Sequence, residues 1–211
     1  MPTHSDQLVF YPFEGGKRLT EDDLRARYPW TWDYLSQHRP QLEHRKAVSS
    51  GANPWWRPIR TRDPEAMLRP KIVCPHLMLT PRFAIDEAGK FAVSRSPYLI
   101  ANDEQEETTS LKFFCAILNS SICHWYIQAH APKYGNGYNR VEVSLVKDIP
   151  VLDPAKIPVG QLRELLDLVD EATRDELRPE IESKLDRLVA EFYGLSPSER
   201  QVLLGTDIGL H

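Results

Sequence analysis

An apolar stripe between residues 111 and 125 is the feature that most restricts how this chain can fold. Its members recur at intervals of three and four residues, which places them on one face of an α-helix. They are Leu111, Phe114, Cys115, Leu118, Ile122 and Trp125. A stripe of this kind more often belongs to a core than to a cofactor site, so we predict one long buried helix from Ser110 onward.

Short β-strand signals surround this helix in residues 55–150. Four runs are apolar or alternate between apolar and polar residues, as short strands do: "KIVC", "RFAID", "KFAVS" and "YLIA". The stretch "DEAG" between Ile85 and Lys90 predicts a hairpin connection. The acidic stretch "NDEQEE", residues 102–107, predicts an exposed loop before the helix.

Helical signals mark the N-terminal segment, residues 1–48. Thr20 precedes "EDDLRAR", which carries acids in its first turn, so we expect a helix to start there. We expect a second helix to begin near Thr31 and to be broken or restarted at Pro40. The segment "SSGANPWWRP" is dense in turn-forming residues and predicts a loop.

Two more amphipathic helices are predicted after Pro158. Their apolar positions are Leu162, Leu165, Leu166 and Val169 in the first, and Ile181, Leu185, Leu188 and Phe192 in the second. A turn near Arg178 and Pro179 would pair them as an antiparallel hairpin, and Gly194 should end the second helix. A capping box at Ser196 and Glu199, with a proline between them, predicts a last short helix.

These signals together predict an α+β fold. Its parts are a helical N-terminal segment, a β-rich body with one long inserted helix, and a helical C-terminal hairpin. The first domain would span residues 1–150, and residues 151–211 would form a helical extension packed on it. No internal repeat or low-complexity tract interrupts this order.

The charge pattern permits an anionic partner without requiring one. The net charge is −4, but the acids are concentrated in residues 151–211, which hold 13 acids and 7 bases. Residues 39–95 hold 11 bases and 5 acids, so positive potential could be gathered on one face. A basic stretch of this size is more often an ordinary solvated face.

Targeting signals and disulfides are not expected. No apolar run approaches the roughly 20 residues that a membrane span needs, and the N-terminus has no basic region followed by an apolar core. Three cysteines form no disulfide framework, which fits a reducing compartment. We therefore predict a cytoplasmic protein.

The usual catalytic and metal-binding motifs are missing. The sequence contains no G-x-G-x-x-G, G-x-x-x-x-G-K-[ST], G-x-S-x-G or H-E-x-x-H. Cys115, Cys123, His124 and His130 fit no zinc-ligand spacing, so no metal is expected. Scattered acids that could serve a metal-dependent nuclease share no geometry: Asp63, Glu65, Asp86 and Glu87. The sequence favours a binding protein over an enzyme.

The segment "PKYGNGYNR", residues 132–140, carries the groups that touch nucleic acid. Its two glycines permit positive φ, and Asn136 tolerates the left-handed region. Its cations suit phosphates, its asparagine amides suit base edges, and its tyrosine rings suit stacking or sugar contact. Taken alone, the segment is also what an ordinary polar surface turn contains.

Five stretches, in order, resemble one known domain. They are "YPWTWDYLSQHRPQLEHR", "WWRPIR", "RPKIVCPHL", the pair "LKFFCAILNSSICHWYI" and "PKYGNGYNRVEVSLVKDIPV", and "IESKLDRLVAEFYGLSPSER". From about Phe10 to Leu204 the chain resembles the C-terminal target recognition (specificity) domain of TaqI-like adenine-N6 DNA methyltransferases, including type IIG restriction-modification enzymes. Each piece is weak alone, and their shared order is what makes the resemblance specific.

The resemblance implies a division of labour. In such enzymes an N-terminal domain binds S-adenosylmethionine and grips the flipped adenine with an Asn-Pro-Pro-Tyr/Phe motif, while the C-terminal domain reads the DNA. This chain has neither that motif nor a cofactor-binding glycine strand, and its Asn53-Pro54-Trp55-Trp56 lacks the second proline. We therefore expect no cofactor here, S-adenosylmethionine in a missing catalytic domain, and no enzyme activity from this chain alone.

Ten residues are the candidate DNA contacts under this resemblance. Phosphate contacts would come from Arg57, Lys71, Arg82, Lys133 and Arg140. Base contacts would come from Asn119, Asn136 and Asn139, and sugar or stacking contacts from Tyr134 and Tyr138. Asn119 also has a structural reading, as a support for the loop.

The predicted function is sequence-specific recognition of double-stranded DNA for an adenine methyltransferase or restriction-modification enzyme. A methyltransferase catalytic domain or subunit is the expected protein partner. The main alternative is a protein-protein interaction module in which the acidic helical hairpin docks a partner. A degenerate remnant without DNA binding and a metal-dependent nuclease are the remaining alternatives.

Overall fold

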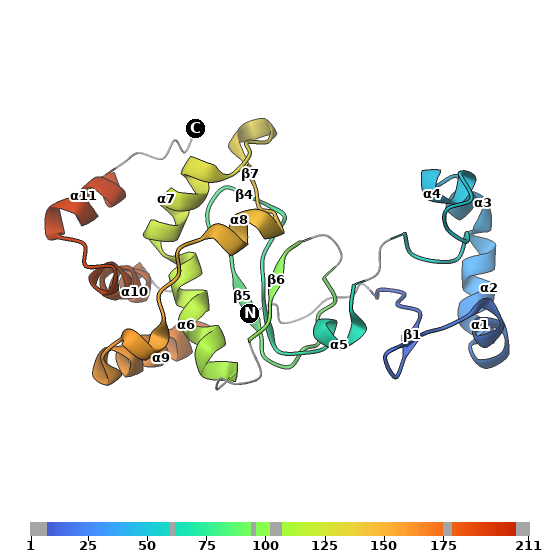
Figure 1. The fold of residues 1–211 in the computed structure, drawn as a ribbon, viewed down its shortest axis with the longest axis horizontal. Coiled ribbons are helices and arrows are strands. Elements are labelled where there is room, and N and C mark those ends of the chain that lie inside the picture. The colour runs from blue at the N-terminus through green and yellow to red at the C-terminus, as the bar shows by residue number, and fades with distance from the viewer. Residues whose placement is uncertain (1–7, 60–61, 94–95, 102–106, 175–178, 206–211) are drawn as a thin grey trace. The chain divides into compact units, whose positions relative to one another are not determined.

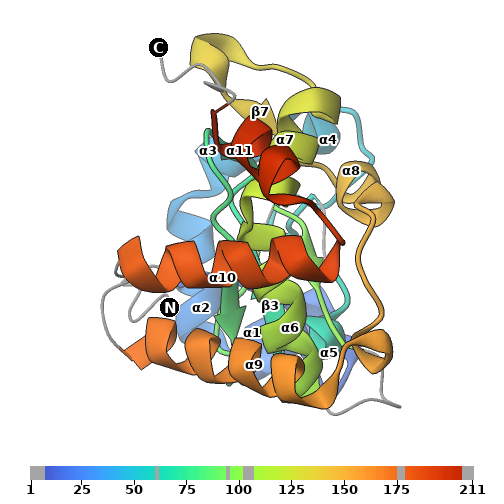
Figure 2. The same cartoon turned by 90° about the vertical axis from the view of Figure 1, so that its left-hand side faces the viewer.

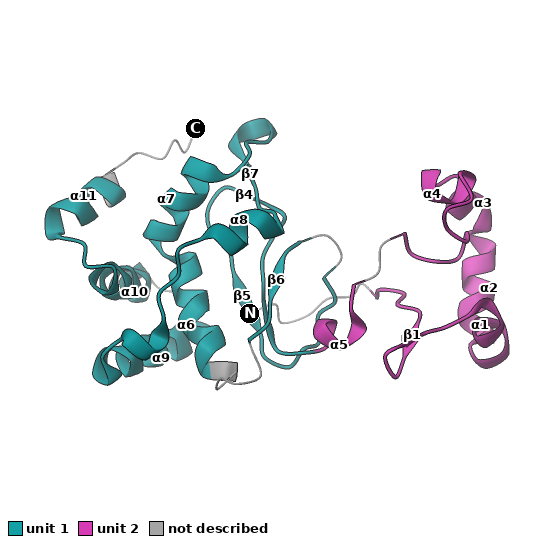
Figure 3. Cartoon of the chain, in the orientation of Figure 1, with its two compact units in different colours: residues 1–3, 69–211 teal, residues 4–68 magenta. Residues whose placement is uncertain are grey.

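The computed structural model describes residues 8–59, 62–93, 96–101, 107–174 and 179–205. The chain divides into a smaller unit, residues 4–68, and a larger unit that contains residues 69–211 (Figure 3). Each unit has its own cluster of buried apolar side chains. The mixture of helices and short strands confirms the α+β fold. Which parts of the chain act as separate functional domains stays a prediction.

The smaller unit is built from short helices. Its elements are β1 (Phe13–Glu14), β2 (Lys17–Arg18), α1 (Glu21–Arg27), α2 (Pro29–Gln37), α3 (Arg39–Glu43), α4 (Lys46–Ser49) and α5 (Pro64–Met67). As predicted, Thr20 caps α1, where it exchanges hydrogen bonds with Asp23 in a capping box. The second helix begins at Pro29, before the expected Thr31, and the chain restarts at α3 with Pro40 in its first turn, as predicted.

The core of the smaller unit gathers around three buried side chains, Leu24, Leu35 and Trp56. The Trp56 indole Nε1 donates to the Glu21 carboxylate at 3.2 Å, which satisfies its polar group inside the core. The β1–β2 hairpin that precedes α1 was not predicted from the sequence.

The larger unit contains two small antiparallel sheets. In the first, β3 (Lys71–Val73) lies between β5 (Ala84–Asp86) and β6 (Tyr98–Leu99). In the second, β4 (Leu77–Met78) pairs with β7 (Asn139–Arg140), so two segments about 60 residues apart in sequence meet. The runs "KIVC", "RFAID" and "YLIA" form strands as predicted.

Two strand-level predictions are wrong. The described part of "KFAVS", residues 90–93, forms no strand, so the turn at residues 87–88 is not a hairpin connection. Instead Asp86 accepts hydrogen bonds from the Lys90 and Phe91 amides, which turns the chain away after β5. The exposed loop predicted at residues 102–107 lies outside the described residues except for Glu107, where α6 begins.

The predicted single helix is in fact two helices, α6 (Glu107–Asn119) and α7 (Ser121–His130). Ser120 ends the first and caps the second, because its hydroxyl accepts from the Cys123 amide. The change of direction breaks the apolar stripe: Leu111, Cys115 and Leu118 are buried, whereas Trp125 is 45 % exposed. The expectation that Trp125 lies in the core is therefore wrong.

Helix α6 lies between the first sheet and the C-terminal helical hairpin (Figure 1). It packs against β3 and β5 on one side and against α9 (Val159–Arg174) and α10 (Pro179–Phe192) on the other. Burial on both sides explains why Phe113 and Ile117, outside the predicted stripe, are also covered. Between the sheets and the hairpin, α8 (Val143–Asp148) and the short 3-10 helix η2 (Pro154–Lys156) carry the chain across.

The helices α9 and α10 run side by side, as the sequence predicted (Figure 2). The predicted turn residue Arg178 lies outside the described residues, and Pro179 begins α10. Gly194, with φ 69°, ends this helix, and Ser196 and Glu199 form the capping box that starts α11 (Pro197–Gly205). No helix in the described part of the chain is long and apolar enough to cross a bilayer.

Candidate nucleic-acid interface

Residues 132–140 form a closed loop, called here the 132–140 loop. The Arg140 amide donates to the Pro132 carbonyl at 2.9 Å, and the Tyr134 amide donates to the Tyr138 carbonyl at 2.7 Å. The loop ends in β7, which is paired with β4. Because its two arms are tied to each other and to a second strand, the loop is a shaped projection with a fixed base.

A left-handed turn forms the tip of the loop, in the short 3-10 helix η1 (Gly135–Gly137). Asn136 has φ 60° and ψ 32°, and it is the one residue other than glycine with positive φ among the described residues. Gly137 follows with φ 76°. A Cβ at Gly137 would meet only Leu79, at 4.0 Å, so the backbone conformation, rather than lack of space, favours glycine here.

The tip presents its side chains outward. Tyr134 is 57 % exposed and Tyr138 is 37 % exposed, and Lys133 and Asn136 are exposed as well. An exposed polar tip with two aromatic rings gathers the kinds of side chain that can contact the phosphates, bases and sugars of nucleic acid. The structure thus brings four of the ten sequence-predicted residues together on one exposed projection.

The Lys133 ammonium is held by two neutral acceptors. Its Nζ donates to Gln128 Oε1 at 2.6 Å and to Asn139 Oδ1 at 2.7 Å. No ion pair found within the described ranges includes Lys133. Because amide oxygens fix the ammonium without cancelling its charge, Lys133 keeps its full charge and one remaining donor.

The other predicted cations of the larger unit are placed differently. Arg140 lies 2.9 Å from Glu142 in an ion pair, without the alignment of a hydrogen bond, so part of its charge is already compensated. Arg82 is exposed and forms no ion pair within the described residues. Arg82 and Lys133 are therefore the more available cations for a phosphate.

The predicted phosphate contact of Lys71 is inconsistent with its position. Lys71 is completely buried, and its Nζ forms an ion pair with Asp86 at 2.5 Å inside the first sheet. Burial alone would raise the pKa of the Asp86 carboxyl, but hydrogen bonds from Lys71 and from the Phe91 and Lys90 amides outweigh it and lower that pKa. Lys71 is thus a structural residue of the sheet.

Two predicted base contacts also have internal roles. Asn119 is anchored to Phe83, the residue before β5, since its Oδ1 accepts from the Phe83 amide and its Nδ2 donates to the Phe83 and Cys115 carbonyls, all at 2.9 Å. Asn139 is completely buried beneath Lys133, so its amide cannot reach a base edge in this conformation. Its Nδ2 has no hydrogen-bond partner among the described residues.

Arg57 belongs to the smaller unit. Its guanidinium lies over the Trp56 ring, 5.2 Å from the centroid, and its Nε is buried without a partner in the described part of the chain. Its backbone carbonyl accepts from Asn53 Nδ2 at 2.8 Å. Whether Arg57 shares a surface with the 132–140 loop stays a prediction.

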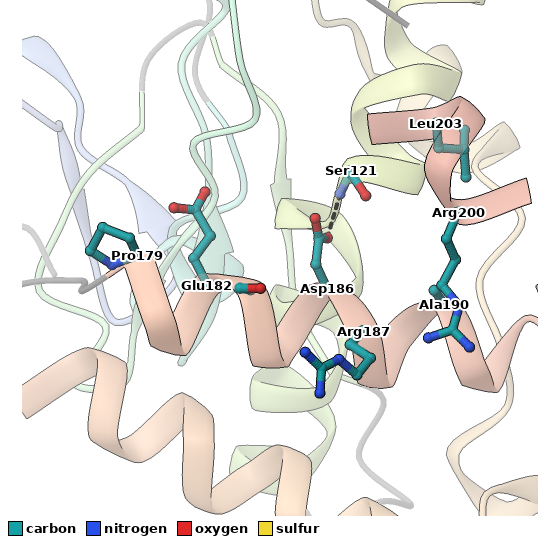
Figure 4. Close-up of a pocket in the computed structure, with 9 residues that line it drawn as sticks. Ser121, Pro179, Glu182, Asp186, Arg187, Ala190, Arg200 and Leu203 are labelled. Atoms are coloured by element: carbon teal, nitrogen blue, oxygen red, sulfur yellow. Dashed lines mark hydrogen bonds between the residues drawn. The ribbon is translucent and has the colours of Figure 1, made fainter. Parts of the chain in front are cut away.

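Helix α7 carries the loop and is anchored at its start by the C-terminal hairpin. Asp186 of α10 accepts a hydrogen bond from the Ser121 amide at 2.7 Å (Figure 4). A carboxylate at this end of a helix is also favoured by the helix dipole. One carboxylate of the acidic hairpin, that of Asp186, therefore helps to hold α7 in place.

A cavity of about 440 Å³ adjoins this contact, between α10, α11 and the start of α7 (Figure 4). Its lining carries both signs of charge, from Glu182, Asp186, Arg187 and Arg200. Two of these groups are already engaged, Asp186 with Ser121 and Arg200 with Glu191 at 3.4 Å. The cavity is a junction between helices with mixed charge.

Sequence reasoning missed the role of two side chains beside the loop, His124 and Gln128. His124 Nε2 lies 3.2 Å from the Leu79 carbonyl, and Gln128 Nε2 lies 3.3 Å from the same carbonyl and 3.2 Å from His124 Nε2. Both side chains are one turn apart on α7, a spacing that could have drawn attention to them. Their link to Lys133 depends on how the loop folds back, which no local pattern reveals.

The cysteines are buried. Burial raises the pKa of Cys74, Cys115 and Cys123 to about 12 in each case. In the part of the chain that the structure describes, no group of three His, Cys, Asp or Glu side chains could hold a metal ion.

Comparison with known proteins gives one family. The model of the TaqI-like C-terminal specificity domain matches residues 21–151. The chain is 24 % identical over 200 residues to the type II methyltransferase M.BstVI of Geobacillus stearothermophilus, covering 94 % of this chain and 33 % of the relative. It is 25 % identical over 192 residues to the type II methyltransferase M.BanIII of Aneurinibacillus aneurinilyticus, covering 90 % of this chain and 33 % of that protein.

The chain thus spans about a third of the length of these relatives. The matched segment includes the 132–140 loop, both small sheets of the larger unit and the helices α6 and α7. The resemblance inferred from the sequence is confirmed, and the chain belongs to the TaqI-like C-terminal specificity domain family.

Proposed function

We propose that this chain reads the sequence of double-stranded DNA for an adenine-N6 DNA methyltransferase or restriction-modification enzyme. The family supports this reading, since its description is that of a specificity domain and both relatives are type II methyltransferases. The relatives are about three times as long as the chain. Methyl transfer and S-adenosylmethionine binding would belong to a catalytic domain or subunit that acts with this chain.

The observation that carries the proposal is the Lys133 ammonium at the edge of an exposed aromatic tip. Two neutral amide oxygens fix this cation and leave its charge uncompensated. A cation held for internal stability is usually paired with a carboxylate, as Lys71 is with Asp86. A positioned, uncompensated ammonium suits an external anion, and duplex DNA offers phosphates along both strands.

Roles follow from exposure. Lys133 and Arg82 would contact phosphates and set the position of the duplex, with a smaller contribution from Arg140. Asn136, at the left-handed tip, is the remaining candidate for a base edge, and a bidentate amide-adenine pair gives about 1–3 kcal/mol of discrimination. Tyr134 and Tyr138 would pack on sugars or beside an extruded base.

Selection from a pool of randomised duplexes tests the proposal. We expect the chain to enrich a short sequence, and we expect Asn136→Gly to weaken the preference while overall affinity falls little. The glycine variant preserves the left-handed backbone and removes only the amide, so it isolates the side chain. Recovery of the same sequence with equal preference by the variant would remove Asn136 from the reading surface. Recovery of no preferred sequence by the parent chain would refute sequence reading.

Docking of a protein partner is the second candidate, and α2 favours it. Trp30 is 86 % exposed and Tyr34, one turn later, is 62 % exposed. Exposed tryptophan and tyrosine are typical of protein interfaces. The two functions are compatible, and Trp30→Ser with Tyr34→Ser should leave duplex binding unchanged if the aromatic pair serves a protein partner.

A further inference from the structure

A chain of hydrogen bonds connects the 132–140 loop to helix α7. An ammonium group has three donors and no acceptor, so the amide atom of Gln128 that faces Lys133 must be oxygen. The Gln128 NH₂ group then points to the Leu79 carbonyl and to His124 Nε2. His124 Nε2 also lies 3.2 Å from the Leu79 carbonyl oxygen, so it can donate to Leu79 or accept from Gln128.

The Gln128 amide cannot flip without losing its contact with Lys133. A flip would place the amide NH₂ against the Lys133 ammonium, so two donors would meet. Asn139 is constrained in the same way, since its Oδ1 accepts from Lys133 and its burial prevents rearrangement toward solvent. Two amide oxygens, one on α7 and one on β7, therefore fix the position of Lys133.

We propose that Gln128 and Asn139 are positioning residues that hold Lys133 as an uncompensated cation for DNA. Neither amide needs to touch the duplex. The role of Lys133 in DNA binding rests on the proposed function, whereas the hydrogen bonds that hold Lys133 are a property of the protein alone.

The substitution Gln128→Glu tests this with almost no change in shape. One carboxylate oxygen would pair with Lys133 and cancel its charge, and the other would accept a proton from His124 Nε2. Gln161→Glu is the matched control, because it makes the same chemical and charge change in the first turn of α9, where an acid suits the helix dipole.

The first measurement uses the ¹⁵N chemical shifts of the His124 imidazole in the protein without DNA. We expect Gln128→Glu to raise the pKa of His124 relative to the parent chain, because a carboxylate oxygen replaces the amide nitrogen that lies 3.2 Å from His124 Nε2. Gln161→Glu should leave this pKa unchanged. An unchanged His124 pKa in Gln128→Glu would show that Gln128 does not lie between His124 and Lys133, and would overturn the positioning role.

The second measurement is the salt dependence of binding to a mixed-sequence duplex. Loss of one phosphate contact should lower the slope of log affinity against log salt by about 0.9 in Gln128→Glu, so its deficit should shrink about threefold between low salt and fourfold higher salt. Gln161→Glu should keep the parent slope. Equal loss of slope in both variants would show that net charge alone acts and would overturn the positioning role.

Failure of the proposed function can be told apart from failure of this inference. A parent chain that does not bind duplex, together with a raised His124 pKa in Gln128→Glu, would refute DNA recognition while the arrangement around Lys133 stands. The variant Gln128→Met separates charge from position, because it frees Lys133 without neutralising it. We expect it to keep the parent slope and to bind severalfold more weakly, and full parent affinity would count against a positioning role.

Discussion

The buried pair of Lys71 and Asp86 gives the sharpest prediction about stability. The two side chains lie inside the first sheet, with the ammonium and carboxylate 2.5 Å apart. The Lys90 amide donates to one carboxylate oxygen and the Phe91 amide to the other, so Asp86→Asn keeps one acceptor and turns the second into an NH₂ group that faces a donor. The variant also removes the charge that lies opposite the Lys71 ammonium.

The expected loss follows from the cost of removing one charge of a buried pair. Breaking one partner of a buried pair costs about 3–5 kcal/mol, whereas replacing both by neutral groups is often close to neutral. We place the loss for Asp86→Asn at the lower end, about 3 kcal/mol, because Lys71 also donates to the Arg69 carbonyl. For a chain of this size that is a fall in melting temperature of about 6–12 °C. Lys71→Met/Asp86→Asn should recover most of it.

Urea denaturation of the parent chain, both single variants and the double variant measures the coupling directly. We expect a coupling free energy of more than about 3 kcal/mol between the two sites, because each single variant should lose about 3 kcal/mol and the double variant should lose less than either. The pH dependence has a definite sign, since the pKa of Asp86 is lowered in the folded state. Its contribution is present above the unfolded carboxyl pKa of about 3.9 and is lost as pH falls through the folded value. Single variants as stable as the parent, or a double variant no better than Asp86→Asn, would refute the reasoning.

The remaining predictions concern the thiols, the α7 anchor and the loop. Cys74, Cys115 and Cys123, each with its pKa raised to about 12, should resist alkylation at pH 8 in the folded chain and react after unfolding, as mass spectrometry would show. Asp186→Ala should cost about 1 kcal/mol in denaturation experiments because α7 loses an N-terminal acceptor, and an unchanged midpoint would argue against this anchor. Asn136→Ala should be less stable than Asn136→Gly by about 1 kcal/mol, because alanine is strained at positive φ; equal stabilities would mean that the tip relaxes.

Capping and periodicity explain which parts of the fold could be predicted. Thr20, Pro40, Gly194 and the Ser196 capping box act within one turn of their own backbone, so their effects are visible in the sequence. The break at Ser120 is different. The apolar spacing continues across it, and the helix ends because Ser120 caps a second helix that runs in a new direction.

Long-range contacts explain what could not be predicted. The run "KFAVS" alternates like a strand, but Asp86 captures the Lys90 and Phe91 amides and leaves no hairpin. Pairing of β4 with β7 joins segments that no local pattern connects.

The candidate site shows the same limit. The loop at residues 132–140 could be recognised from its composition, and its left-handed tip from Asn136 and Gly137. The burial of Lys71 and Asn139 could not be inferred, because a lysine or asparagine looks the same in sequence whether it faces solvent or the core. The support that Gln128 gives to Lys133 arises only after the loop has folded against α7.

The salt dependence of duplex binding by the parent chain and by Lys133→Met tests the central claim most directly. Methionine keeps the length and apolar character of the side chain and removes the charge. We predict that affinity for a mixed-sequence duplex falls steeply as salt rises, and that Lys133→Met lowers the slope of log affinity against log salt by about 0.9. Binding that is insensitive to salt in the parent chain, or identical slopes for the two proteins, would contradict the account.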